Sequence, residues 1–172
     1  AMARIREAQG DLDGALAMLD EAERQYVPGA DPDLRPIGAR KARLWIAQAR
    51  IHDALAWARE RDLSPAGELS YLREFEHLVL ARALMAEGSP EALDQAVGLL
   101  QRLLEAAEAG QRTGSVIEIL VARALAYEAM GDIPTARESL GRALSLAEPE
   151  GYVRVFTGEG ESMERLLSEA RL

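Results

Sequence analysis

A segment that recurs four times at nearly equal intervals is the feature of this sequence that most restricts its fold. A Gly-Asp pair begins the segment 10–25 and occurs again at the start of the segment 131–149. In both segments Ala, Leu and Ala follow the Gly at the same offsets. The matching residues are Gly10, Ala15, Leu19 and Ala22 in the first copy and Gly131, Ala136, Leu140 and Ala143 in the last.

Two weaker copies lie between them, at 49–62 and 89–110, with Ala54 and Ala96 at the place of Ala15. A period of roughly 40 residues in helix-forming sequence is typical of stacked helical hairpins. The sequence also holds 31 Ala and 25 Leu among 172 residues, which favours helices that pack closely on one another. The predicted fold is all-α, an α-α superhelix of about four helical hairpins.

Apolar residues at helical spacing place the first helices of three repeats at about 38–50, 71–87 and 115–130. Pro and Gly between the helices mark the breaks. We predict one domain over 1–172, with repeats at roughly 1–26, 36–62, 70–109 and 113–148, and a connector and capping helix at 149–172. The aromatics of this connector, Tyr152 and Phe156, are expected to pack on the end of the repeats. Ser162 is the predicted N-cap of the last helix.

Charge and composition exclude several functions. Twenty basic and 29 acidic side chains give a net charge of -9, which would repel a phosphate backbone, so we expect no direct binding to nucleic acid. The absence of Cys excludes disulfides, thiolate nucleophiles and Cys-based zinc sites. The sequence contains neither an apolar run long enough to span a membrane nor a signal-peptide core, which predicts a cytoplasmic protein without membrane contact.

No motif in the sequence nominates catalytic, cofactor-binding or metal-binding residues. The two histidines, His52 and His77, lie in different repeats and outside metal-binding spacings, so surface or packing roles are expected. A phosphate-binding loop of the form GxxxxGK[ST] is missing. We therefore predict a chain that is not an enzyme and holds no cofactor or metal.

The first helix of each repeat is expected to line the inner face of the superhelix. Arg4, Arg43 and Arg82 stand at equal intervals along the chain, each at the same distance before the turn positions 10, 49 and 88. Each guanidinium group in such a row could bind a carboxylate or phosphate through two parallel N–H donors, which predicts an anionic ligand or an acidic peptide. The alternative is that each Arg pairs with a nearby Glu at the surface, a contact worth at most about 1 kcal/mol.

Six other residues fall on the same predicted face, and core packing is the alternative for the hydrophobic ones. These six candidates are Ile46, Phe75, Leu78, Met85, Val121 and Glu128.

The frame of Gly-Asp, a hydrophobe and Ala at the fifth place resembles the second helix of tetratricopeptide (TPR) repeats. Ala124 and Tyr127 stand where that family has a small residue and a Tyr, although the repeat period here is longer than in that family. The stretches TGSVIEILVARALAYEAMGD at 113–132 and ALSLAEPEGYVRVFTGEGESMERLL at 143–167 resemble a narrower group. This group is the helical-repeat region of MalT-like, large ATP-binding regulators of the LuxR family.

The resemblance implies a segment that senses an inducer, cut from a longer transcription regulator. In that family an N-terminal module binds ATP and a C-terminal helix-turn-helix domain binds DNA, and neither is present in this sequence. The expected partner is a small-molecule inducer or a protein or peptide bound on the concave face. The alternative function is a general adaptor that binds proteins without a small-molecule ligand.

Overall fold

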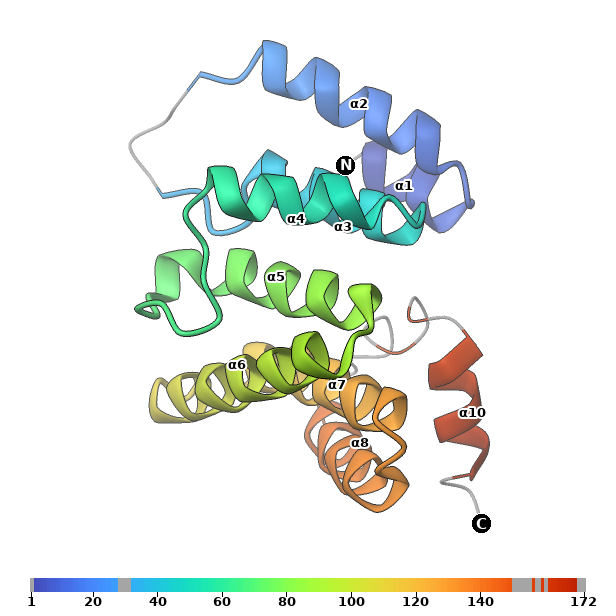
Figure 1. The fold of residues 1–172 in the computed structure, drawn as a ribbon. Helices are drawn as coiled ribbons and strands as arrows, with labels where there is room; N and C mark the ends of the chain where they lie inside the picture. The colour runs from blue at the N-terminus through green and yellow to red at the C-terminus, as the bar shows by residue number, and fades with distance from the viewer. Residues whose placement is uncertain (1, 28–31, 150–155, 157–158, 160, 170–172) are drawn as a thin grey trace. The chain divides into compact units, whose positions relative to one another are not determined.

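The computed structural model describes residues 2–27, 32–149, 156, 159 and 161–169 (Figure 1). Within these residues the chain forms nine α-helices and one short 3-10 helix, and no strand. The prediction of an all-α, TPR-like helical repeat is confirmed. Contacts divide the chain into two compact units, Ala1–Glu87 and Gly88–Leu172, which we call the first and second unit. The prediction of one domain over 1–172 stays a prediction.

The first unit consists of two helical hairpins followed by a single helix (Figure 1). Helix α1 packs on α2, α2 packs on α3, and α3 and α4 pack on each other and on α5. The apolar core shared by the first three helices includes Ala3, Ala15, Leu19 and Leu44. The helices of this unit are α1 (Met2–Ala8), α2 (Leu12–Arg24), α3 (Ile37–Ala47), α4 (Ile51–Glu60), the 3-10 helix η1 (Tyr71–Arg73) and α5 (Glu74–Glu87).

The second unit is built around helix α7, which packs on both α6 and α8. Helix α7 carries buried side chains of its own on every face, as expected of a helix inside a core. A short helix, α10, packs on α7 and α8, and Phe156 before it is buried. Tyr152 lies outside the described residues. α10 begins at Glu161, so Ser162 lies inside the helix, and its predicted role as N-cap is wrong. The helices of this unit are α6 (Pro90–Ala109), α7 (Thr113–Ala129), α8 (Ile133–Ala147) and α10 (Glu161–Glu169).

The turn between the two helices of a repeat has the same backbone conformation in all four copies. Gly10, Ala49, Gly88 and Gly131 have φ angles of +78°, +58°, +79° and +80°, in the left-handed region. This conformation ends a helix and satisfies its last carbonyl groups. It carries a steric cost for residues with a Cβ, so Gly is the favoured residue there. The repeated Gly of the sequence frame therefore has a structural cause.

The Asp of the Gly-Asp pair caps the following helix. Asp11 accepts a hydrogen bond from the backbone N of Gly14 at 2.9 Å, and Asp132 accepts one from Thr135 N at 3.2 Å. The bond from Gly14 N, together with the guanidinium of Arg6, lowers the pKa of Asp11 below its ordinary value. The pair thus encodes the end of one helix and the start of the next, which explains why it marks the repeat.

The second repeat departs from this frame, because Ala49 stands where the other copies have Gly. Replacing Ala49 with Gly is expected to raise the free energy of unfolding by about 0.5–1 kcal/mol, since the new residue adopts φ +58° without a Cβ clash. Denaturant unfolding followed by tryptophan fluorescence measures this, because both tryptophans, Trp45 and Trp57, lie in the first unit.

The matched control is Gly10→Ala, where an added Cβ meets no atom within 4 Å. Any loss of stability there reports only the backbone conformation at φ +78°. We expect a loss of about 1 kcal/mol. If both substitutions changed stability in the same direction, the left-handed turn would not explain the Gly of the repeat.

Candidate functional site

The three arginines of the predicted row, Arg4, Arg43 and Arg82, all lie in the first unit, on the first helices of successive repeats. Arg4 on α1 is exposed, whereas Arg43 on α3 and Arg82 on α5 are partly buried. We call these three residues the arginine row. The structure thus places them on α1, α3 and α5, as the repeat register predicts, and their role in binding stays a prediction.

Arg43 has a carboxylate neighbour within the chain. Its Nη2 lies 3.9 Å from Oε1 of Glu7 on α1, and both side chains are about 40% exposed. That separation is longer than a hydrogen bond, and an exposed ion pair contributes at most about 1 kcal/mol. The contact matches the alternative of a surface ion pair.

The apolar candidates differ in their accessibility. Phe75 and Leu78 on α5 and Val121 on α7 are buried, which favours core packing over contact with a ligand. Arg35, in the loop before α3, stacks on the Phe75 ring with its Cζ 4.6 Å from the centroid. The sequence pattern placed Phe75, Leu78 and Val121 on first helices, as observed, but it could not separate an inner face from the core.

The remaining candidates are partly accessible. Ile46 on α3 and Met85 on α5 are partly buried in the first unit. Glu128 lies in the last turn of α7 in the second unit, where its Oε1 accepts a hydrogen bond from Nη2 of Arg165 on α10. Seven of the nine candidates thus belong to the first unit and two, Val121 and Glu128, to the second.

A cluster that sequence reasoning missed surrounds Lys41, the single lysine of the chain. Its ammonium group binds Asp20 Oδ1 at 2.8 Å and Glu23 Oε2 at 2.9 Å, which joins α3 to α2. Burial disfavours the charged lysine, but the hydrogen bonds to Asp20 and Glu23 outweigh it and raise the pKa. Lys41 is therefore charged at neutral pH and unsuited to act as an amine nucleophile. The cluster serves to hold the first two hairpins together.

A second missed cluster contains a buried carboxylate between two arginines. Glu76 at the start of α5 is 2% exposed. Its Oε1 accepts a hydrogen bond from Arg61 Nε and its Oε2 one from Arg73 Nε, each at 2.9 Å. Arg73 Nη2 also donates to the carbonyl oxygen of Arg61 at 2.6 Å. These bonds tie the turn after α4 to the start of α5.

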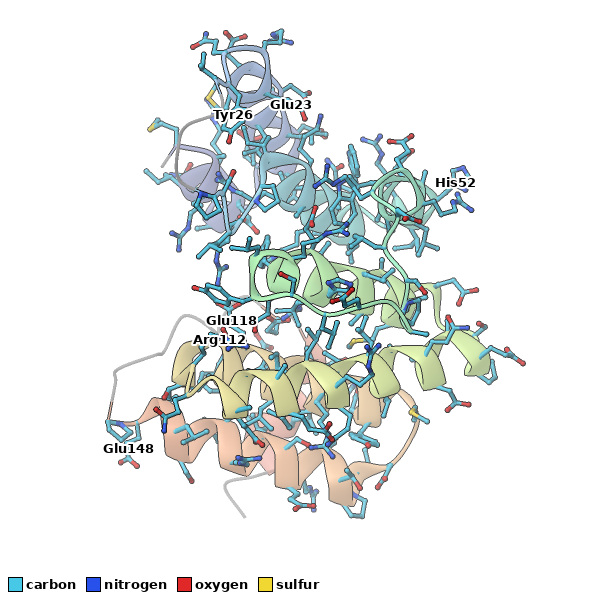
Figure 2. All side chains as sticks on the ribbon, turned by 90° about the vertical axis from the view of Figure 1, so that its left-hand side faces the viewer. Glu23, Tyr26, His52, Arg112, Glu118 and Glu148 are labelled. Atoms are coloured by element: carbon cyan, nitrogen blue, oxygen red, sulfur yellow. The ribbon has the colours of Figure 1, made fainter. Side chains whose placement is uncertain are left out.

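The two histidines do not come together. His52 on α4 is exposed and points away from the fold (Figure 2), whereas His77 on α5 is buried with Nδ1 3.0 Å from the Arg73 carbonyl oxygen. No group of three or more His, Asp or Glu side chains among the described residues is arranged to hold a metal ion. In the same part of the chain, no helix combines the length and apolar character needed to cross a membrane.

Comparison with known protein families identifies the family of this chain. The family described as the MalT-like TPR region matches residues 1–172, the whole length of the chain. The chain belongs to this family. Comparisons with curated proteins and with solved structures gave no match. The resemblance inferred from 113–132 and 143–167 is thereby confirmed.

Membership in the MalT-like TPR family defines what kind of site to expect. The chain is a helical-repeat domain of the type found in MalT-like regulators. Such domains are generally non-catalytic, and TPR-like repeats generally mediate interactions with proteins or ligands. Among the candidates, the arginine row of the first unit fits such an interaction best, because its charged groups are at least partly accessible.

Proposed function

We propose that this MalT-like TPR region is the sensing segment of a LuxR-family transcription regulator and binds an anionic inducer or an acidic peptide. The observation that supports the proposal is the arginine row, whose three residues stand at the same repeat position on α1, α3 and α5. The chain belongs to the MalT-like TPR family, and TPR-like repeats generally mediate interactions with proteins or ligands. Guanidinium groups bind carboxylates and phosphates with two parallel hydrogen bonds. A row of them suits a ligand with several anionic groups.

In the proposed mechanism, binding favours one arrangement of the helical repeats over another. A ligand shifts such an equilibrium only by its difference in affinity for the two arrangements. Contacts to arginines on α1, α3 and α5 would provide this difference, because their spacing changes when these helices move. The ATP-dependent assembly step and the binding of DNA belong to other modules of the parent regulator. This cytoplasmic segment has no cofactor, metal or catalytic activity of its own.

The proposal predicts that Arg43→Ala and Arg82→Ala each weaken anion binding by about tenfold, and together by about a hundredfold. Citrate, inorganic phosphate and a glutamate-rich peptide serve as probes in calorimetric titrations. The control is Arg59→Ala, which removes an exposed arginine of α4 outside the arginine row. Circular dichroism should show unchanged helix content in every variant. Equal affinities for the original chain and the double variant would remove the arginine row from the proposal.

The alternative is an adaptor that binds another protein, an activity that TPR-like repeats also have. A pull-down from the native cell extract distinguishes the two functions. An adaptor should retain a protein in stoichiometric amount, whereas a sensor should bind a heat-stable small compound from the same extract. Retention of a protein in an amount unaffected by Arg43→Ala and Arg82→Ala would favour an adaptor with a different surface.

A further inference from the structure

Arg35 is an exposed cation in the loop before α3 and does not belong to the arginine row. Its guanidinium stacks on the ring of Phe75, near the start of α5, with Cζ 4.6 Å from the ring centroid. The loop is held by a second contact, in which Asp33 Oδ1 accepts a hydrogen bond from the backbone N of Arg35 at 3.0 Å. Stacking on a ring uses the flat face of a guanidinium, whereas the N–H donors that bind anions lie in its plane. Phe75 thus seats Arg35 in an orientation suited to binding an anion.

The stack places Arg35 on the same face of the first unit as two residues of the arginine row. Phe75 and Arg82 share one face of α5, because residues seven apart in a helix are separated by two turns. Two turns put the level of Phe75 about 10 Å along α5 from that of Arg82. Arg43 stands at the same repeat position as Arg82, on α3, which packs on α5. The guanidinium groups of Arg35, Arg43 and Arg82 are therefore spaced by about 10 Å on one face, and we call these three residues the arginine triangle.

Within α3 and α5, no acidic residue stands at the helical positions that form this face. Apart from Phe75 and the two arginines, these positions hold Ala39, Ile46, Leu78 and Met85. Glu7 on α1 lies at the edge of the face, 3.9 Å from Arg43. The face thus collects three positive charges in a chain whose net charge is -9. The negative charge of the whole chain repels multiply charged phosphates more strongly than carboxylates, which bring one charge each, so the arginine triangle favours carboxylates.

We propose that Arg35 is a further binding residue of the sensing site and that the ligand is an extended dicarboxylate, whose two carboxylates are about 10 Å apart. One carboxylate binds at the level of Arg43 and Arg82, and the other binds Arg35 through paired N–H donors. Phe75 is a positioning residue, because it holds the guanidinium of Arg35 and is itself buried. This inference rests on the proposed function, since it uses two arginines of the row, and it adds a binding residue and the length of the ligand.

The test measures the binding of two dicarboxylates, sebacate and succinate, to the full chain by calorimetric titration. The long sebacate reaches Arg35 and the level of Arg43 and Arg82 at once, whereas succinate is too short and binds only the two arginines of the row. Arg35→Ala is expected to weaken sebacate binding about tenfold and to leave succinate binding within about twofold of its original value. Arg43→Ala/Arg82→Ala should weaken the binding of both. Decanoate, which has the chain length of sebacate but a single carboxylate, should bind no more tightly than succinate.

Phe75→Leu tests the seat separately, because it removes the aromatic ring and keeps the charge of Arg35. Sebacate binding should weaken about threefold, since the guanidinium is no longer held, and succinate binding should not change. A purely structural role of Phe75 would change the binding of both ligands together. The matched control is Arg59→Ala, which removes an exposed arginine of α4 and should leave both affinities unchanged. Circular dichroism and denaturant unfolding show whether each variant keeps its fold.

Two results would overturn this inference and leave the proposed function in place. In the first, Arg35→Ala has no effect on sebacate binding, although Arg43→Ala/Arg82→Ala weakens it. In the second, Arg35→Ala weakens sebacate and succinate binding equally, which would mean that Arg35 does not bind one end of the ligand. If no variant of the arginine triangle alters the binding of either dicarboxylate, or of citrate, phosphate and the glutamate-rich peptide, the inference and the proposed function fail together.

Discussion

Replacing both Arg61 and Arg73 with alanine is expected to lower the free energy of unfolding of the first unit by about 3–5 kcal/mol. The double substitution removes both guanidinium partners of the Glu76 carboxylate, which is 2% exposed. A buried carboxylate without a cation loses its hydration and gains nothing in return. The expected loss is a large part of the roughly 5–15 kcal/mol that stabilises a typical domain. Denaturant unfolding followed by the fluorescence of Trp45 and Trp57 measures it.

Two further variants show whether the stranded charge causes this loss. Adding Glu76→Gln to the double variant replaces the carboxylate with a neutral amide, which costs less to bury, and about half of the lost stability should return. Arg59→Ala, which removes an exposed arginine on α4, should change stability by less than about 0.5 kcal/mol. No recovery with Gln would mean that the arginines act through packing of their alkyl chains and not through Glu76.

The Glu76 cluster also illustrates what the sequence could not predict. Glu76 is one of 29 acidic residues, and neither its spacing nor its neighbours in the sequence distinguish it from the exposed ones. Its burial depends on the path of the chain between α4 and η1, which brings Arg61 and Arg73 to it from two sides. Lys41 poses the same difficulty, because its partners Asp20 and Glu23 lie on a different helix.

The fold, in contrast, could be predicted because its signals are local. The Gly-Asp pair encodes a left-handed residue and an N-cap, and these two features end one helix and begin the next wherever they occur. The first helices predicted at 38–50 and 115–130 correspond to α3 (Ile37–Ala47) and α7 (Thr113–Ala129). The accessibility of a first helix has no such local signal in the sequence, because it depends on which other helices cover it. The burial of Val121 on α7 was therefore beyond the sequence pattern.

The repeat register allows a second large effect to be predicted, with a control inside the same chain. Leu44 on α3 and Ile5 on α1 both stand five residues before the turn of their repeat, at Ala49 and Gly10. Leu44 is 2% exposed and packs with Ala15 and Leu19 of the preceding hairpin, whereas Ile5 is 50% exposed. The two residues thus occupy the same helical position but differ in burial.

Leu44→Ala should therefore lower the free energy of unfolding by about 2–5 kcal/mol. The loss combines the hydrophobic burial of the removed side-chain atoms with the cavity left between α2 and α3. Ile5→Ala should cost less than about 1 kcal/mol, because its side chain is half in solvent and Ala is the better helix former. Denaturant unfolding of both variants, monitored through Trp45 and Trp57, compares them directly. Hydrogen exchange should show that Leu44→Ala exposes the amides of α1 and α2 before those of α4, since the lost contact joins the first hairpin to α3. Equal losses in the two variants would mean that position in the repeat, and not burial against the preceding hairpin, sets the energy of this contact.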